Sequence, residues 1–450
     1  MNRHKVILIS PPFSSQLTPT LALAEAFREE GLHTIIACGE SFKEKIQRDG
    51  FGFVPLLVNR NSNTGIAQQT KLPEEERRRL HSFLESTKKG AVATLLLQSR
   101  DRREDMFADP ESLFHDVERI NRNESPDLWV ANQLSYAVTL VLYCLDYPFI
   151  TFCPPHPLTI PKGKKIYGVP GAWPSSIPVD KRELDTLIAT ATEVEKSFTE
   201  EFNQIIRKRG TSRRIVANAF RLTSQKAVFF NYPDFKEGPR TKYNAEEDTR
   251  EFYLGSCFEE EPLPPAYEKR LAPCRDKKPK ILLVLGTFLS YREDVLNTCI
   301  ASTKKRFPNS VVIVGAGASA EVLRKMELED VLVEEYVPQK ALIPHMDVIM
   351  HHGGNNTFTE SLYYGKPMII MPFSSDQFDV ASDAEKYSLA PVLDPNSLNY
   401  ERLASALQLA LSGAYEGTLS HWSKHVRSRG PRYAVRKLLY TENMSTEKCQ

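Results

Sequence analysis

The sequence predicts an α/β protein made of two halves, each built on a parallel β-sheet. Short apolar runs typical of strands alternate with helix-like segments in both halves of the chain, and a proline-rich stretch separates the two series. The chain has 450 residues, which is enough for two or three domains with cores of their own. We therefore expect two doubly wound domains that face each other across a cleft.

The first half opens with a strand, a helix and a second strand. Residues 5–10 form an apolar run, and residues 20–30 carry apolar side chains at helical spacing. Gly31 ends this helix before a second apolar run at 33–38. This order is typical of a parallel sheet. Further strands are expected at 128–131 and 149–152, with helices at 135–145 and 181–209.

The other segments set the expected domain boundaries. Residues 60–120 are rich in charge, as in the run EEERRR, and predict an insert of surface helices. Prolines mixed with charges at 256–279 predict a linker, after which the alternating pattern restarts. The expected units are a first domain at 1–255, the linker, a second domain at 280–425 and a C-terminal segment at 426–450.

Composition excludes several classes of protein. Lys and Arg total 58 and Asp and Glu total 57, so bulk charge gives no reason to expect a nucleic-acid partner. No run approaches the ~20 apolar residues of a membrane span, and the apolar run at 6–10 is too short for a secretory signal, so we expect a cytoplasmic protein. The seven cysteines are scattered and form no CxxC or Cys/His metal pattern.

The strongest chemical signal is the stretch from 336 to 377. A predicted strand ends at His352, two glycines follow, and a helix begins near Asn356. Glycines allow a ligand to approach the backbone, and a helix N-terminus offers free N–H groups, so a pyrophosphate fits there. One helical turn further on, Glu360 is placed to take both hydroxyls of a ribose. Asp376 and Gln377 follow a further strand and are candidates for binding sugar hydroxyls.

This stretch resembles the nucleotide-sugar signature of family 1 glycosyltransferases, which have the two-domain GT-B fold. The bacterial antibiotic- and macrolide-modifying branch is the most similar, because the chain reads Leu-Gly-Thr in one loop and Tyr-Val-Pro-Gln in another. The resemblance extends over nearly the whole chain, apart from residues 60–120, where such enzymes build acceptor lids. It also implies that the C-terminal helix crosses back to the first domain. The matching positions are Tyr336, Pro338, Gln339, His352, Gly354, Asn356, Thr357, Glu360, Gly365, Pro367, Asp376 and Gln377.

The resemblance implies a role for each of these donor-site residues. Val337 and Gln339 would hold the base and ribose, with Tyr336 stacked on the base. Glu360 would bind the hydroxyls of the ribose, and Asp376 and Gln377 would bind the transferred sugar. The phosphates would be held by His352, Gly354, Asn356 and Thr357, and by the loop Gly286-Thr287.

One part of the family's pattern is missing. A histidine after the first strand normally takes the acceptor proton, and an aspartate fixes its tautomer. Counting from Pro19, the histidine's position is Gln16, and the aspartate's position is Asn132. An amide does not titrate in the working range, so neither residue is a general base. Losing a base typically slows a reaction by ~10²–10⁴-fold.

Three interpretations of this departure stay open. In the first, the acceptor needs little deprotonation because it is a carboxylate, an acidic phenol or an amide, and Gln16 and Asn132 position it. Alternatively, another residue supplies the base, for which His156 in the proline-rich loop at 154–175 is the candidate. Finally, the chain binds a nucleotide sugar without transferring it, although it retains Asp376 and Gln377.

We therefore expect an inverting, metal-independent glycosyltransferase. Its donor would be a UDP- or dTDP-sugar used as co-substrate, without a further cofactor, and its acceptor a small hydrophobic molecule such as an antibiotic or other natural product. The alternatives are a catalytically silent nucleotide-sugar-binding auxiliary protein and a GT-B epimerase. The epimerase needs carboxylates near C2 of the sugar, which the loop at Gln16 does not supply.

Overall fold

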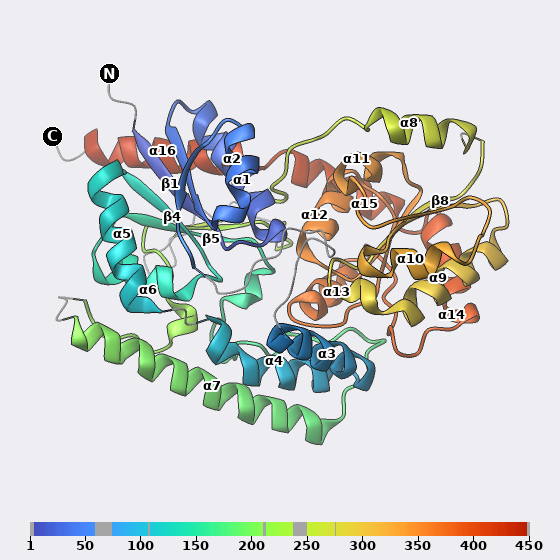
Figure 1. The fold of residues 1–450 in the computed structure, drawn as a ribbon, viewed down its shortest axis with the longest axis horizontal. Coiled ribbons are helices and arrows are strands. Elements are labelled where there is room, and N and C mark those ends of the chain that lie inside the picture. Colours follow the sequence, from blue (N-terminus) through green and yellow to red (C-terminus); the bar gives the residue numbers. More distant parts are fainter. Residues whose placement is uncertain are drawn as a thin grey trace.

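The computed structural model describes residues 4–58, 74–106, 109–209, 213–236, 250–274 and 276–447. Figure 1 shows two lobes, the first made mainly of the N-terminal half and the second of the C-terminal half. Each lobe contains one parallel sheet with helices packed on it, as predicted for the GT-B fold. The expected insert begins among residues 59–73, which lie outside the described residues, as do 107 and 108.

The N-terminal sheet has seven parallel strands in the order β3-β2-β1-β4-β5-β6-β7. The strands nearest the centre are buried along their whole length, which is why their sequences are nearly uniformly apolar. The carboxyl ends of β1, β4 and β5 lie at the edge of the sheet where a parallel fold places its ligand. The strands are β1 (Lys5–Ile9), β2 (His33–Cys38), β3 (Gly52–Pro55), β4 (Leu128–Asn132), β5 (Phe149–Cys153), β6 (Ala227–Phe230) and β7 (Arg250–Tyr253).

The C-terminal sheet has five parallel strands in the order β10-β9-β8-β11-β12. Its two central strands, β8 and β11, carry the loops predicted to bind the donor phosphates. The strands are β8 (Lys280–Val284), β9 (Val311–Gly315), β10 (Val331–Glu334), β11 (Val348–His351) and β12 (Met368–Ile370).

Helices of the two halves cover these sheets and meet between the lobes (Figure 1). Helices α3 and α4 of the insert pack on each other, and α4 also packs on the long helix α7. The helices of the N-terminal half and linker are α1 (Ser14–Glu29), α2 (Lys43–Arg48), α3 (Glu74–Lys89), α4 (Ala91–Met106), α5 (Pro110–Glu124), α6 (Tyr136–Cys144), α7 (Lys181–Lys208) and α8 (Pro265–Leu271). Those of the C-terminal half are α9 (Glu293–Arg306), α10 (Ala320–Arg324), α11 (Gln339–Leu342), α12 (Asn355–Tyr363), α13 (Gln377–Lys386), α14 (Tyr400–Leu411), α15 (Glu416–Arg427) and α16 (Pro431–Glu447).

The last helix, α16, packs against α1 in the first lobe. Ala434, Val435 and Leu438 are buried in the apolar core beneath α1. Arg436 adds an ion pair with Glu30 at 2.6 Å. Apolar burial therefore holds the end of the chain on the first lobe, while the domain boundaries themselves stay a prediction.

Two local expectations need correction. Helix α1 begins at Ser14 rather than at residue 20, so Pro19 lies inside the helix. A proline has no N–H to donate, which leaves the carbonyl of Ser15, four residues earlier, without its helical partner. The expected linker is also less irregular than predicted, because residues 265–271 form α8. The edge strands β3 and β7 were not predicted, since each is only four residues long.

Candidate functional site

The start of α12 forms the centre of the candidate donor site. Strand β11 ends at His351, Gly353 adopts a φ of +82°, and the helix begins at Asn355. A Cβ on Gly354 would lie 2.5 Å from Nε2 of His352, so only glycine fits beside this ring. The turn therefore exposes the N-terminal end of a helix, where free N–H groups favour an anion.

Both histidines of this turn are neutral at physiological pH. Burial, with a smaller effect of His352, lowers the pKa of His351 to about 3, and its Nδ1 accepts a hydrogen bond from the N–H of Gly353. Burial lowers the pKa of His352 to about 4. The ring of His352 faces Gly286, which has a φ of +77° in the loop after β8. The two predicted phosphate loops are thus adjacent across His352.

The predicted ribose ligand, Glu360, is buried on the first turns of α12. Gln339 donates from Nε2 to Glu360 Oε2 at 2.7 Å and to Thr357 Oγ1 at 3.0 Å. The side chain of Glu360 has no cation within ion-pair distance among the described residues. Burial raises its pKa to about 7, although the hydrogen bond from Gln339 lowers it. The carboxyl is consequently close to its titration point at neutral pH.

The two residues predicted to meet the base differ in exposure. Tyr336 is 63% exposed, so its ring is free to stack on a planar ligand. Val337 is buried against Gly315, and its carbonyl accepts from the N–H of Gln339. A contact of Val337 with a base would therefore involve its backbone rather than its side chain.

The predicted sugar ligands lie at the start of α13, where Asp376 is the N-cap and Gln377 the first helical residue. Asp376 Oδ2 accepts a hydrogen bond from the backbone N–H of His156, which comes from the other lobe, at 2.9 Å. Gln377 turns inward, and its Oε1 accepts from the N–H groups of Phe373 and Ser374. Gln377 thus shapes the loop, while Asp376 lies where the lobes meet.

The two amides at the expected base positions form a pair. Asn132 donates from Nδ2 to Gln16 Oε1 at 3.1 Å, and its own Oδ1 accepts from the N–H of Leu134. This second bond fixes the orientation of the Asn132 amide. Asn132 thus holds Gln16 as an orienting residue would hold a base, but neither amide can take up a proton.

The first turn of α1, which carries Gln16, lies directly beside the start of α12. Asn356 donates from Nδ2 to the carbonyl of Ser15 at 2.8 Å, which is the carbonyl that Pro19 leaves without a helical partner. Asn356 also accepts from Asn231 at 3.1 Å. A direct hydrogen bond therefore joins a predicted phosphate residue, Asn356, to the residue that precedes Gln16.

His156, the predicted alternative base, lies in a different setting. Its ring is buried, its Nδ1 accepts from the N–H of Leu158, and its Nε2 lies 3.0 Å from Asp383 Oδ2. Burial lowers the pKa of His156, but the hydrogen bond to Asp383 and the charges of Asp379, Asp383 and Asp376 outweigh it and raise the pKa. Both ring nitrogens are engaged, so this geometry argues against a role as acceptor base.

Several residues at the junction of the lobes were not predicted. Asn355 donates to the carbonyls of Pro154 and Asn231 from the other lobe. Asp379 accepts from the N–H of Gly171 at 2.6 Å, and Asp383 accepts from the hydroxyl of Tyr232. The spacing of Asp376, Asp379 and Asp383 on one face of α13 was the available signal for this junction.

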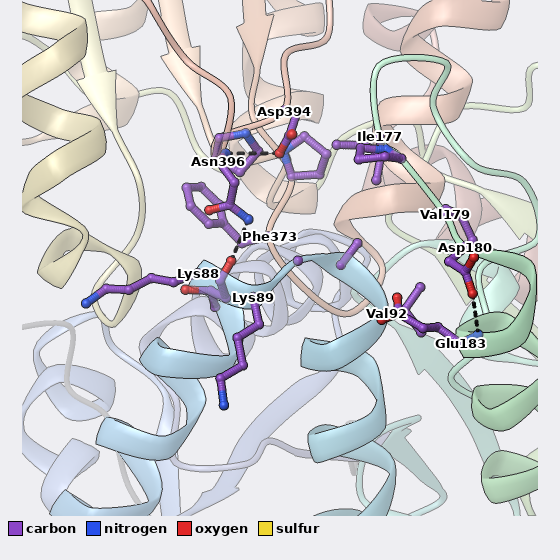
Figure 2. Close-up of a pocket in the computed structure, with 16 residues that line it drawn as sticks. Lys88, Lys89, Val92, Ile177, Val179, Asp180, Glu183, Phe373, Asp394 and Asn396 are labelled. Carbon is purple, nitrogen blue, oxygen red and sulfur yellow. Dashed lines mark hydrogen bonds between the residues drawn. The ribbon is translucent and has the colours of Figure 1, made fainter.

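A separate cavity of about 400 Å³ lies between the insert and the C-terminal lobe (Figure 2). It is lined by the α3–α4 break, by residues 177–180 with Glu183, and by Phe373 and Asn396. None of the predicted donor-site residues lines it. Over the described ranges, no three His, Cys, Asp or Glu side chains are grouped to hold a metal ion. Within the same ranges, no helix combines the length and apolar character needed to cross a bilayer.

The fold and this site define a GT-B glycosyltransferase that uses a nucleotide-sugar donor. Residues 248–425 match the family model described as UDP-glucoronosyl and UDP-glucosyl transferase. The match confirms the resemblance predicted from the motifs, and with it the assignment as a glycosyltransferase.

Individual relatives agree with this assignment. The chain is 24% identical to demethyllactenocin mycarosyltransferase of Streptomyces fradiae, over 89% of this chain and 78% of that protein. It is 20% identical to the NDP-glycosyltransferase YjiC of Bacillus subtilis (strain 168), over 92% and 90% of the two chains. Among solved structures, the fold is similar to the glycosyltransferase of kitacinnamycin, with a TM-score of 0.68, 18% identity and coverage of 98% and 99%. It is also similar to VinC in complex with DTDP, with a TM-score of 0.65, 18% identity and coverage of 97% and 98%.

Proposed function

We propose that this protein transfers a sugar, with inversion, from a dTDP- or UDP-sugar to a small hydrophobic natural product. The observation that carries the proposal is the hydrogen bond between Asn356 and Ser15. It joins the first turn of α1, where an acceptor would be activated, to the helix start where a diphosphate would bind. The relative named demethyllactenocin mycarosyltransferase supports the acceptor class, and a similar fold in complex with DTDP supports the nucleotide.

In this proposal the donor spans the C-terminal lobe from Tyr336 to Asp376. Tyr336 stacks on the base, and Glu360, released from Gln339, accepts the two ribose hydroxyls. The diphosphate takes the free N–H groups at the start of α12 and the side chain of His352. Asp376 receives the sugar, which requires its hydrogen bond from His156 to be shared or exchanged.

The transfer step forms one bond and breaks one. An acceptor oxygen attacks the anomeric carbon from the face opposite the diphosphate, and the electron pair of the breaking C–O bond leaves with the diphosphate. The helix N-terminus and the neutral His352 stabilise the charge that develops on the leaving group. No metal is assigned a part in this step.

The Gln16–Asn132 pair favours an acceptor that needs little deprotonation. With a carboxylate or an ionised phenol, no proton has to be removed, and the pair would orient the acceptor through hydrogen bonds. The engaged ring of His156 makes this interpretation preferable to a base supplied from residues 154–175. We accordingly propose acidic phenols and carboxylates as the acceptors to be screened first.

Calorimetric titration of UDP, dTDP and GDP tests the donor site. We expect UDP or dTDP to bind the wild type and to bind Glu360→Ala at least ~10-fold more weakly, because the ribose loses its acceptor. Gly417→Ala is a matched control, since a Cβ there meets no atom within 4 Å. No binding of any nucleotide to the wild type would overturn the proposal.

A silent nucleotide-sugar-binding protein is the second candidate, and the missing base at Gln16 is the observation that favours it. Radiolabelled donor incubated with phenol, carboxylate and alcohol acceptors separates the two functions. Label appearing in any acceptor establishes transfer. Tight nucleotide binding without transfer or donor hydrolysis on the whole panel would favour the silent protein.

A further inference from the structure

We propose that Gln98, on helix α4 of the insert, is a positioning residue for the sugar end of the donor site. The inference rests on the proposed function, because it assigns the sugar to Asp376. Gln98 donates from Nε2 to Ser375 Oγ at 2.9 Å, and its Oε1 accepts from the backbone N–H of Ser375 at 3.2 Å. Both ends of one amide therefore hold the residue that precedes Asp376.

Ser375 needs such support because of its backbone conformation. Its φ is +54°, in the left-handed region that residues other than glycine rarely adopt. A strained residue keeps this conformation only where its surroundings hold it, and such residues cluster at ligand sites. The backbone conformation of Ser375 sets the direction of the peptide that leads to Asp376. A change in that conformation would therefore move the Asp376 carboxylate.

Two glutamines, one from each half of the chain, hold this loop through hydrogen bonds. Gln377 accepts from the N–H groups of Phe373 and Ser374, and Gln98 accepts from the next N–H along the chain, that of Ser375. Three consecutive backbone donors are thus paired with side-chain oxygens. Without Gln98, the Ser375 N–H loses its partner and the strained turn loses its external support.

The insert presents Gln98 from a fixed position. Thr87, near the end of α3, accepts from Arg292 at 3.2 Å through its hydroxyl and from Asn396 at 2.8 Å through its carbonyl. The guanidinium of Arg292 is almost fully buried and also bonds Asn396 and Asp294. The insert is consequently bonded to the C-terminal lobe at two places, Thr87 and Gln98, and it forms part of the sugar site.

The test compares a nucleotide with its sugar conjugate. Calorimetry measures the affinities of dTDP and dTDP-glucose, or UDP and UDP-glucose, for wild type, Gln98→Met and the control Arg100→Gln, an exposed position of the same helix. We expect Gln98→Met to bind the nucleotide as the wild type does. The additional affinity supplied by glucose should fall about tenfold, the loss expected for two hydrogen bonds.

A second variant shows whether the effect passes through the backbone of Ser375. Glycine adopts a positive φ without strain, so Gln98→Met combined with Ser375→Gly should recover part of the lost sugar affinity. A general loss of packing at α4 would not be recovered in this way. Recovery therefore supports the positioning role, and its absence counts against it.

The outcomes separate this inference from the proposed function. If the wild type binds neither nucleotide, the proposed donor site fails. If the wild type gains affinity from glucose and Gln98→Met gains the same, the donor site stands and the role of Gln98 is overturned. A wild type that binds the nucleotide but gains nothing from glucose also overturns it, because no sugar contact then exists for Gln98 to position.

Discussion

Glu360→Gln should make the protein more stable at alkaline pH while it weakens donor binding. Burial raises the pKa of Glu360 from 4.5 to about 7, so ionising this carboxyl in the folded protein costs free energy that the unfolded chain does not pay. A change of this size corresponds to about 3 kcal/mol once both states are ionised. The carboxyl therefore lowers stability increasingly as pH rises from about 4.5 through 7.

Glutamine removes the titration and keeps the shape. Its amide oxygen can still accept the hydrogen bond from Gln339, whose Nε2 lies 2.7 Å from Glu360 Oε2. Relative to wild type, we expect Glu360→Gln to be stabilised by less than about 1 kcal/mol at pH 5 and by about 3 kcal/mol at pH 8. Urea unfolding at the two pH values measures the difference, and titration with dTDP and UDP measures the loss of binding.

The dependence on pH is the decisive result. A constant difference between pH 5 and pH 8 would mean that Glu360 has an ordinary pKa in the folded protein, and the argument from burial would then be wrong. Glu401→Gln, at an exposed position on α14, is the control and should show no comparable change with pH. Added nucleotide should also raise the unfolding midpoint of the wild type more than that of Glu360→Gln.

Three further perturbations test the remaining parts of the site. The double variant Gln16→His with Asn132→Asp restores a base and its orienting carboxylate, so transfer to alcohol acceptors should rise by ~10²-fold or more; no rise on any alcohol would mean that Gln16 does not occupy the base position. Gly354→Ala places a Cβ 2.5 Å from the His352 ring and should weaken dTDP and UDP binding at least ~10-fold. Nucleotide affinity equal to that of Gly417→Ala would contradict the argument that only glycine fits beside this ring. Asp383→Ala leaves the His156 ring and a tyrosine hydroxyl without their acceptor and should lower the free energy of unfolding by about 1–3 kcal/mol, and an unchanged urea midpoint would refute the role given to this junction.

Much of the fold could be predicted because its central strands are continuous apolar runs. The strands expected at 128–131 and 149–152 agree with β4 and β5 to within one residue, since each is a continuous apolar run. The start of α1 could not be predicted from Pro19, because a proline inside a helix is ordinarily disfavoured. Its cost here is offset by a contact with the other lobe, which local sequence does not reveal.

In the site, too, local sequence predicts some residues and contacts between distant residues determine others. Apart from Gly286 and Thr287, the predicted donor residues lie within residues 336–377, so one motif predicts them together. Gln98 is 277 positions away from Ser375, and nothing in the sequence of α4 marks it, because its importance comes from the strained backbone of its partner. Long-range pairs of this kind require the tertiary structure.

The contacts between the lobes bear on how the donor enters. In this structure Asn356 is bonded to Ser15, and Asp376 to the N–H of His156, so two predicted donor ligands are engaged by the N-terminal lobe. A donor that uses both must exchange these bonds, and exchange is easiest when the lobes separate. The Ser15 carbonyl keeps no helical N–H when Asn356 leaves, because Pro19 cannot supply one. Separation of the lobes therefore leaves the Ser15 carbonyl as a free acceptor on α1, and Asn356 can bond to it again once the donor has left.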